Sequence, residues 1–467
     1  MDTPAEPLTL ASARGRWVLV ATILGSGMAT LDSTVVNVAL PSIGRDLHGG
    51  IAELQWIVTA YLLTLASLLL IAGALSDRFG RRRVFLVGVV WFAAASVACS
   101  LAPSMLALNA ARALQGVGGA LLTPGSLAII EASFRREDRA AAIGAWSGLG
   151  GITVAIGPFV GGYLVQAWSW RLIFVINVPL ALAVVWLARR YVPETRDPAA
   201  PRRLDLAGAA LAALGLGGLT YALVELPAHG IGAADVIAAA AVGLCALIAL
   251  FVVEGKRAAP MLDLSLFGDR IFSAANAETF VVYAALGGAF FLLPIDLQQV
   301  LGYSPLASGA ALLPATVVLL LLSASMGRLA QRIGPRIPLT VGPIIAACGL
   351  LLLERIGVGR GYATTVLPAL LVFGLGLATT VAPITATVLG AAPTAKVGLA
   401  SAINNCIART GSLIAVATLP AAAGLGAESY LEPDVFAAGF RRGIRIAAML
   451  CAAGGLLAWT TIRNRKP

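Results

Sequence analysis

The sequence is poor in charge. Of its 467 residues, 12% are Asp, Glu, Lys or Arg and 59% are hydrophobic, whereas roughly a quarter of an ordinary soluble domain is charged. A soluble protein would not need one apolar run of about 20 residues after another, which is the length that crosses a bilayer as a helix. The shortage of charge therefore argues against a soluble fold and predicts an all-α, polytopic membrane protein.

Cysteine and histidine are also scarce. The five cysteines fall inside apolar runs without metal-ligand spacing, so we interpret them as small packing residues. The two histidines, His48 and His229, fall between predicted spans. No Gly-x-x-x-x-Gly-Lys-Ser/Thr string occurs, which argues against direct use of ATP. The sequence thus indicates no cofactor and no metal, and it offers no cluster of residues that favours an enzyme.

Windows of about 19 residues predict fourteen membrane spans. The first six spans are 17–40, 51–73, 84–102, 106–130, 140–165 and 171–188. Two follow at 205–224 and 234–253, and six more at 271–293, 307–327, 338–353, 363–388, 399–420 and 441–461. The chain is predicted to divide into a tail (1–16), a six-helix half (17–188), linkers with two inserted helices (189–270), a second six-helix half (271–461) and a tail (462–467).

The basic residues predict the orientation. If the N-terminus lies inside, 24 of the 33 Lys and Arg residues fall in inner segments and 7 in outer ones. Lys and Arg are retained on the cytoplasmic side, so both termini are predicted to lie in the cytoplasm, with the chain in the inner membrane of a cell. The same loops explain the net charge of +10 without a nucleic-acid partner.

A short charged loop, 73–83, joins the second and third spans, and it has a second copy. The copy, 327–336, lies 254 residues later and follows the tenth span, with Gln331 in place of Asp77. A shift of eight spans predicts two parallel six-helix halves separated by two inserted helices. In such an arrangement the substrate site lies between the halves near the bilayer midplane. The inserted helices carry little interior charge and are predicted to pack peripherally.

Asp32 is the acid most clearly placed inside a span, where an ionisable residue is expensive and indicates function. It projects roughly 120° away from a polar stripe on the same helix, so it is expected to face a neighbouring helix. We predict that it binds a proton or a substrate charge; a structural ion pair or cap is the alternative. The stripe is predicted to line a cavity, or else its hydroxyls bond back to their own helix, and it consists of Thr22, Ser26, Thr30, Ser33 and Asn37.

Further ionisable residues lie in other spans. Arg112 keeps its charge at any accessible pH and therefore needs a partner. Glu278 is predicted either to bind a cationic substrate or to pair or snorkel near the interface. Arg409, beside Asn404 and Asn405, could bind an anionic group or stabilise its half. Asp296 is expected in a solvated loop.

The fifth span carries small residues at spacings of three and four. Gly144, Gly148, Gly151, Ala155, Pro158 and Gly162 share one face. Such a face allows a neighbouring helix to approach closely.

Six stretches resemble, in chain order, signatures of the fourteen-span drug:proton antiporters of the major facilitator superfamily. They are Leu31–Pro41, Gln55–Tyr61, 73–83, Arg112–Gly119, Gly148–Leu164 and Trp170–Pro179, and two later stretches, Leu297–Pro305 and Ser401–Gly411, look similar too.

The resemblance implies residue roles. Asp32 would carry the coupling proton, Arg112 would assist its relay, and an Asp77–Arg81 pair would lock the inner gate. The gate motif would comprise Gly73, Asp77, Arg78, Gly80 and Arg81, and the antiporter motif Gly148, Gly157, Pro158, Gly161 and Gly162. The substrate-binding candidates are Ser26, Thr30, Ser33, Asn37, Glu278, Asn405 and Arg409.

The implied function is export of a small amphiphilic drug or antibiotic by a monomer that alternates access and is driven by the proton gradient. A proton symporter or uniporter for a small metabolite would share the fold, and a membrane enzyme or sensor is the more distant alternative. The sequence leaves open the identity and charge of the compound, the proton stoichiometry and the breadth of specificity.

Overall fold

A computed structural model describes residues 7–197, 204–257, 260–357, 359, 361–426 and 432–463. The predicted tails and the basic linker extend beyond this part, at 1–6, 198–203 and 464–467. Within the described residues the regular structure is helical, apart from one isolated β-bridge between Leu8 and Phe134.

The helices follow the predicted order. The first half contains α1 (Ala13–Asp46), α2 (Ile51–Phe79), α3 (Arg81–Ser100), α4 (Met105–Ser133), α5 (Arg136–Ala167), the short α6 (Leu172–Val175) and α7 (Asn177–Tyr191). The inserted pair is α8 (Leu206–His229) and α9 (Ala234–Lys256). After the short helix η1 (Leu264–Gly268), the second half contains α10 (Arg270–Gln299), α11 (Pro305–Ala311), α12 (Leu313–Ile333), α13 (Arg336–Leu353), α14 (Val366–Ala391), η2 (Thr394–Lys396), α15 (Val397–Ala422) and α16 (Pro433–Thr461).

Thirteen helical segments of the described chain are long and apolar enough to cross a membrane, with α6–α7 and α11–α12 each counted as one. The remaining long helix, α15, is less apolar because it carries Asn404, Asn405 and Arg409. It nevertheless packs inside the bundle against α2 and α10. These helices confirm the all-α, polytopic membrane fold.

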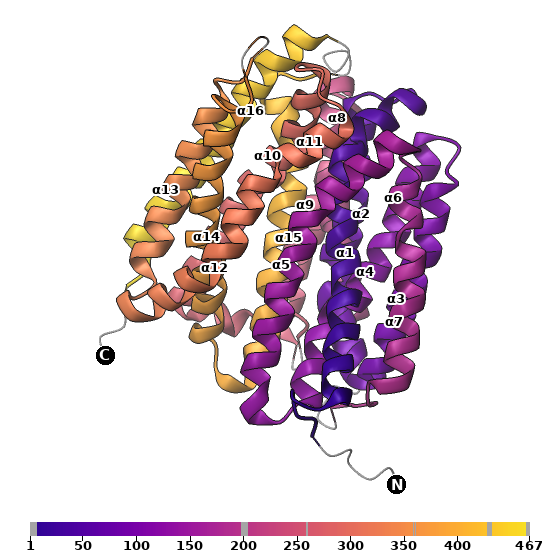
Figure 1. Cartoon of the computed structure of the whole chain (residues 1–467), viewed down its shortest axis with the longest axis vertical. Coiled ribbons are helices and arrows are strands. Elements are labelled where there is room, and N and C mark those ends of the chain that lie inside the picture. The colour runs from indigo at the N-terminus through magenta and orange to yellow at the C-terminus, as the bar shows by residue number, and fades with distance from the viewer. Residues whose placement is uncertain are drawn as a thin grey trace.

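The bundle has two halves, which Figure 1 shows as an indigo-to-magenta group and an orange-to-yellow group. In the first half the closest neighbours are α3 with α4, α2 with α4, and α1 with α5. In the second half they are α13 with α14 and α16, α10 with α15 and α16, and α12 with α14. The seam between the halves is made mainly by α2 against α15 and by α5 against α11. We call the end where α1 begins and α16 finishes the terminal end, and the opposite end the far end.

The packed core shows that the halves meet mainly at the far end. One cluster there contains residues of both halves, such as Ile43 of α1 and Ile295 of α10. Toward the terminal end the core divides into two clusters. Phe134 belongs to a cluster built almost entirely from the first half and Phe272 to one built from the second.

Two glutamines join the halves by hydrogen bonds at the far end. Gln55 of α2 donates to the carbonyls of Val416 and Ala417 in α15, at 2.7 and 3.1 Å, and Gln298 of α10 donates to the carbonyl of Val38 in α1 at 2.8 Å. Pro420 lacks an N–H group and so leaves the Val416 carbonyl, four residues earlier, free to accept. The glutamine side chains therefore satisfy helix carbonyls across the seam.

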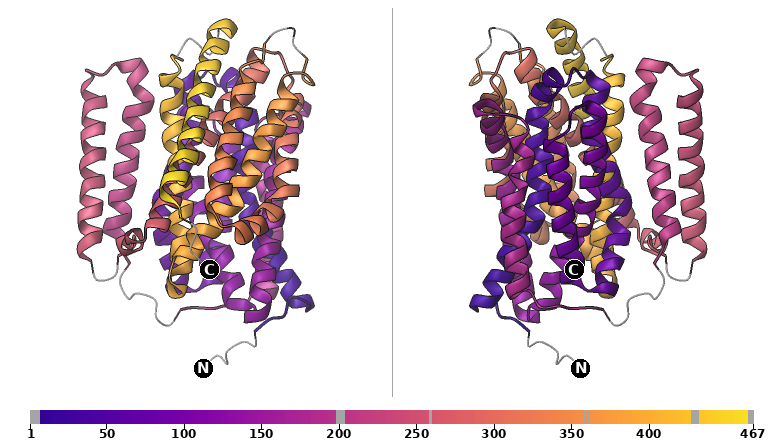
Figure 2. Two further views of the ribbon diagram at one scale, coloured as in Figure 1. Left: turned by 90° about the vertical axis from the view of Figure 1, so that its left-hand side faces the viewer. Right: turned by 90° about the vertical axis from the view of Figure 1, so that its right-hand side faces the viewer.

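The inserted helices α8 and α9 stand at the outside of the bundle (Figure 2). Helix α8 packs against α2 of the first half and α15 of the second. At the far end, Trp56 of α2 donates to Glu225 of α8 at 2.8 Å. The pair is therefore peripheral, as predicted, and it also covers the outer surface of the seam.

The two copies of the repeated loop have the same backbone form. Gly80 ends α2 with φ +112° and Gly334 ends α12 with φ +84°. Both values lie in the left-handed region that glycine adopts without strain. The next helix begins within two residues in each half, so the sequence repeat is also a structural repeat.

Candidate functional site

Asp32 lies in the interior of the first half and is 1% exposed. Its carboxylate contacts Arg112 and Gln115 of α4 and Asn177 of α7, and not the polar stripe on its own helix. This confirms that it faces a neighbouring helix.

Arg112 of α4 has the partner that its buried charge was expected to need, and this partner is Asp32. Its Nη1 lies 2.5 Å from Asp32 Oδ2, and its Nε donates to the carbonyl of Ile57 in α2 at 3.0 Å. The guanidinium also lies over the ring of Tyr61, 4.4 Å from the centroid, so an aromatic face adds cation–π attraction to the ion pair. Arg112 is 1% exposed, and its charge is thus balanced by neighbouring groups and not by solvent.

Neutral polar side chains complete the network. Gln115 accepts from Arg112 Nη1 at 2.5 Å and donates to Asp32 Oδ1 at 2.8 Å. Asn177 of α7 also donates to Asp32 Oδ1, at 3.2 Å, and both amides donate to Ser96 Oγ of α3. Our sequence reasoning missed these three residues. Gln115 and Asn177 lie within two of the family-like stretches, and their polarity inside spans was the available signal.

This arrangement can couple protonation to helix packing. The Asp32 carboxylate is held by one permanent cation and two amides, which come from α4 and α7. A proton on Asp32 would remove the negative charge opposite Arg112. Because a buried cation without a partner is costly, the contact between α1 and α4 would then have to change.

The hydroxyls of the α1 stripe mostly bond to their own helix. Thr22 and Ser26 each donate to two carbonyls, which lie three and four residues earlier. Thr30 donates to the carbonyl four residues earlier, and Ser33 donates to the carbonyl three residues earlier. Ser26 Oγ also accepts from Trp146 Nε1 of α5 at 2.9 Å. The alternative of back-bonding therefore describes these hydroxyls.

Exposure divides the stripe into two parts. Thr22 and Ser26 are buried, whereas Thr30, Ser33 and Asn37 are half-buried. The buried Oδ1 atom of Asn37 has no hydrogen-bond partner among the described residues. The half-buried residues are the part of the stripe that remains available to a ligand.

The glycines of α5 separate into packed and open positions. A methyl group on Gly161 would lie 3.1 Å from the Val35 Cα atom of α1, and one on Gly162 would lie 2.8 Å from the Leu306 Cα atom of α11. The part of α5 nearer the far end therefore makes close approaches to both halves. Gly144 and Gly148, nearer the terminal end, have open space at the corresponding position. The predicted close packing thus holds for only part of the stripe.

The charged loop is held within the first half. Asp77 and Arg81 form the predicted ion pair at 2.9 Å, and the exposed Arg78 lies 5.0 Å from the ring centroid of Phe79. A methyl group added at Gly73, which precedes this pair, would meet open space.

A segment following α7 binds the charged loop. Arg81 N donates to Thr195 O at 2.9 Å, and Arg82 N donates to Glu194 at 3.1 Å. Sequence reasoning missed this contact because it joins segments more than 100 positions apart.

The prediction that Glu278 pairs or snorkels near the interface is wrong, and its assignment as a substrate-binding residue stays a prediction. Glu278 is 0% exposed and neither carboxylate oxygen has a hydrogen-bond partner within the described chain. Its Cγ lies 3.9 Å from a methyl placed on Gly454 of α16. Depth along a span did not reveal that this face of α10 is covered by α16, so Glu278 is enclosed and does not pair at the interface.

The prediction for Asp296 is also wrong. Helix α10 continues to Gln299, six residues beyond the predicted end of the span. Asp296 is 1% exposed on this extra length, and its Oδ1 lacks a partner among the described residues. The extension of the helix places in the core a residue that we expected in solvent.

Helix α15 places its two candidates differently. Asn405 is exposed and donates to the carbonyl of Ser401 at 3.1 Å. Arg409 is half-buried on the same helix, which packs against α2 of the first half and α10 of the second. Arg409 therefore lies on a helix of the seam, whereas Glu278 is enclosed within the second half.

Membrane-length helices arranged in two repeated halves, with an ion pair enclosed in one half, define a membrane transporter. Residues 22–417 match the family model described as Major Facilitator Superfamily. The chain belongs to this superfamily. These findings point to a transporter and not to an enzyme.

Three curated relatives are named as resistance, export or efflux proteins. The chain is 38% identical over 422 residues to the multidrug resistance protein Stp of Mycobacterium tuberculosis, covering 89% of this chain and 77% of Stp. It is 36% identical to the tetracenomycin C resistance and export protein of Streptomyces glaucescens, covering 89% and 77% of the two chains. It is 35% identical to the multidrug efflux pump LfrA of Mycolicibacterium smegmatis, covering 88% and 82%.

Solved structures support the fold at lower sequence identity. A bacterial homologue of the lysosomal transporter Spinster, in an inward-facing and unoccupied conformation, superimposes with a TM-score of 0.69 at 16% identity, covering 97% of both chains. A D-xylose-proton symporter gives a TM-score of 0.67 at 16% identity, covering 97% of this chain and 99% of the symporter. At this identity the likeness concerns the fold alone.

Proposed function

We propose that this protein is a fourteen-span, proton-coupled antiporter that exports small amphiphilic compounds, such as drugs or antibiotics, across the cell membrane by alternating access. The observation that carries the proposal is the enclosed Asp32–Arg112 pair, an acid that can gain a proton only when its ion pair rearranges. The names of the relatives support export, since they describe multidrug resistance, antibiotic resistance with export, and multidrug efflux.

The terminal end is proposed to face the cytoplasm, because it carries most of the basic loops. In that orientation the structure corresponds to a transporter closed toward the outside and more open toward the inside. The glutamine bonds at the far end and the unpacked glycines Gly144 and Gly148 support this assignment.

The proposed cycle depends on the state of Asp32. With Asp32 ionised and paired with Arg112, the substrate enters from the cytoplasm. After the outer end opens and the substrate leaves, Asp32 takes up a proton from outside, which weakens its hold on Arg112. The proton is released on the inner side when the pair forms again. Exchange is coupled because the transporter returns only with the proton bound.

The substrate is proposed to bind between the halves, on the terminal side of the far-end contacts. The half-buried residues Thr30, Ser33 and Asn37 of α1 would provide one wall. Asn405 and Arg409 of α15 would provide the other. This pocket excludes Glu278, which lies behind the surface of its own half.

A proton symporter is the nearest competing function. Its support is the likeness to the xylose symporter, which concerns the fold alone. Stp and the tetracenomycin C protein, which are 38% and 36% identical to this chain, are named for resistance or export, and this favours antiport.

Everted membrane vesicles test the proposal. With the vesicle interior made acidic, the wild type is expected to accumulate a fluorescent amphiphile, and Asp32→Asn is expected to lose this uptake. Asp296→Asn, a change at a buried acid outside the proposed machinery, serves as the control and should retain uptake. If Asp32→Asn took up as much of the compound as the wild type does, Asp32 would have no part in the mechanism. Uptake by the wild type that does not depend on the pH gradient would contradict antiport.

A further inference from the structure

Two open hollows lie on the outer surface of the first half, on the neighbouring helices α3 and α7, which run side by side (Figure 1). One hollow of about 350 Å³ is lined by Leu86, Val87, Val90, Trp91 and Ala94 of α3 together with Arg189 of α7. A second, of about 390 Å³, is lined by Leu182, Val185, Trp186, Arg189 and Arg190 of α7. Arg189 lines both hollows, so they adjoin at this residue, and we call them together the α3/α7 groove.

The walls of the α3/α7 groove are apolar and face outward from the bundle. Val87 is 57% exposed, Val90 54% and Trp186 62%. On α3, Val87, Val90, Trp91 and Ala94 recur at helical spacing and form a stripe about 10 Å long. In a membrane protein such a stripe fits a segment of one acyl chain.

The polar end of the groove has unbalanced positive charge. Arg189 and Arg190 lie in the last turn of α7 and are exposed. Neither makes a hydrogen bond or ion pair with the described part of the chain. The neighbouring Arg82 and Arg83 at the start of α3 share a single acid, Glu194, at 3.8 and 3.7 Å. An anion is therefore the complement that this end of the groove lacks.

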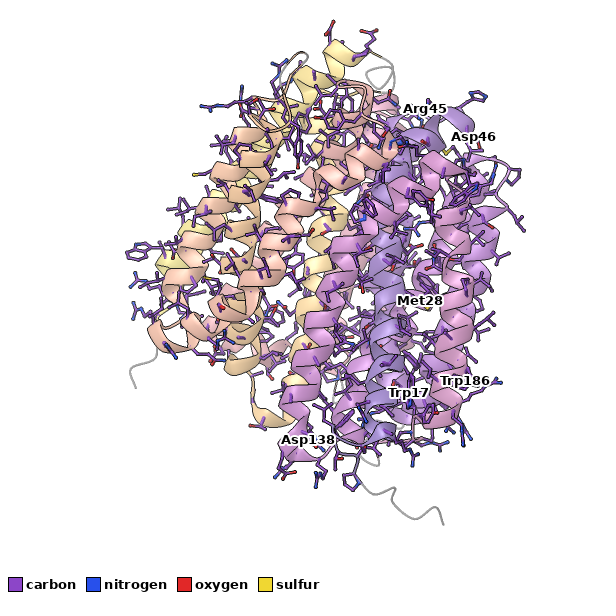
Figure 3. All side chains as sticks on the ribbon, viewed as in Figure 1. Trp17, Met28, Arg45, Asp46, Asp138 and Trp186 are labelled. Atoms are coloured by element: carbon purple, nitrogen blue, oxygen red, sulfur yellow. The ribbon has the colours of Figure 1, made fainter. Side chains whose placement is uncertain are left out.

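Aromatic residues place these arginines at the level of lipid headgroups. Trp186 meets Tyr191 edge to face at 6.2 Å, and Tyr191 stacks on Trp17 of α1 at 5.8 Å. Trp17 and Trp186 lie at the same end of the bundle (Figure 3). Trp and Tyr side chains concentrate where the bilayer meets water, so the groove joins an interfacial cationic site to a hydrocarbon-facing wall.

We propose that the α3/α7 groove binds one anionic phospholipid, whose phosphate is held by Arg189 and Arg190 and whose acyl chain lies along α3. Basic sites beside membrane helices favour anionic headgroups by charge, and the apolar stripe supplies contact for the chain. The site is separate from Asp32, so it does not depend on the proposed transport function.

Native mass spectrometry of the detergent-purified protein tests the site, with phosphatidylglycerol and phosphatidylcholine titrated separately. Arg189→Gln combined with Arg190→Gln removes the headgroup contacts, and Val90→Trp fills the apolar part while keeping the charge. Arg328→Gln combined with Arg332→Gln is the matched control, because it removes two exposed arginines from the terminal end of the other half.

The wild type is expected to bind one phosphatidylglycerol more tightly than any phosphatidylcholine. The Arg189/Arg190 double variant should weaken this binding roughly thirtyfold, the effect of two interfacial cations. Val90→Trp should also weaken it, and the control should not. Equal binding of the two lipids, or unchanged binding in both groove variants, would overturn the proposal. Loss with the arginine variant alone would show surface attraction without a groove and would overturn it too.

Discussion

Arg112 is surrounded by groups of α1, α2 and α4 that balance its charge. The Asp32 carboxylate, the Gln115 amide oxygen and the Ile57 carbonyl contact its donors, and the Tyr61 ring lies against its face. Buried ion pairs are weak evidence for net stability, but removing one partner leaves a charge without compensation. The pair is therefore a position where a single substitution has a large effect.

Arg112→Gln is expected to destabilise the protein, because it leaves the Asp32 carboxylate buried with amide donors only. The expected loss is about 3–5 kcal/mol, the usual effect of removing one member of a buried pair. Thermal unfolding in detergent measures it. Asp32→Asn combined with Arg112→Gln removes both charges and should restore much of the lost stability. Equal unfolding temperatures for the single and double variants would show that the charges are not coupled.

Glu278→Gln is expected to leave transport of a cationic compound unchanged. The carboxyl group is enclosed by α10 and α16, so a neutral side chain of the same shape removes nothing that a substrate contacts. Uptake of a cationic fluorescent compound into everted vesicles is the measurement, with Asn405→Ala as a comparison at the proposed substrate wall. A selective loss of cation uptake in Glu278→Gln would show instead that Glu278 takes part in substrate binding.

At the residue scale, the sequence predicted those properties of a side chain that follow from the geometry of its own helix. The angle between Asp32 and its stripe follows from helical geometry, and so does the need of Arg112 for a partner. The contacts of Gln115, Ser96 and Asn177 depend on how α3, α4 and α7 pack, which spacing along one helix does not contain. The burial of Glu278 against α16 was not predicted for the same reason.

Among the elements, α5 reflects the conformation of the whole bundle. Its glycines near the far end pack against α1 and α11, whereas those near the terminal end meet open space. The spacing of small residues predicted a face for close approach along the full helix. Which part of that face is in contact depends on the position of the halves, and no pattern within α5 sets that position.

The far-end glutamines are expected to hold the halves together. Gln55→Leu combined with Gln298→Leu removes their donors and leaves the Val416 and Val38 carbonyls without these partners. We predict a larger population open at the far end. Electron–electron distance measurements between spin labels at Glu53 and Arg441, in a background without native cysteines, would detect it as longer distances.

The control for this experiment is Ser42→Ala, because the Ser42 hydroxyl accepts a hydrogen bond from Arg45 of the same helix, α1. It should leave the distances unchanged. An unaltered distance distribution in the double glutamine variant would show that the apolar far-end core alone keeps this end closed.

For the whole molecule, composition and the loop repeat were sufficient to predict the helical membrane fold and its two related halves. Composition and the loop repeat did not determine the exact position of the inserted helices. Their apolar composition predicted a peripheral place, but their position over the seam between α2 and α15 depends on contacts between distant segments, such as Trp56 with Glu225. Helix α8 is thus placed to follow movements of both halves.

The central claim is that export of a compound is exchanged for a proton at Asp32. The direct measurement uses purified protein in liposomes with a pH-sensitive dye inside, an imposed pH gradient, and cationic, neutral and anionic amphiphiles added in turn. The wild type is predicted to move protons opposite to at least one compound, and Asp32→Asn is predicted to show no such proton movement. Compound movement without an opposing proton flux in the wild type, or unchanged exchange in Asp32→Asn, would contradict the account.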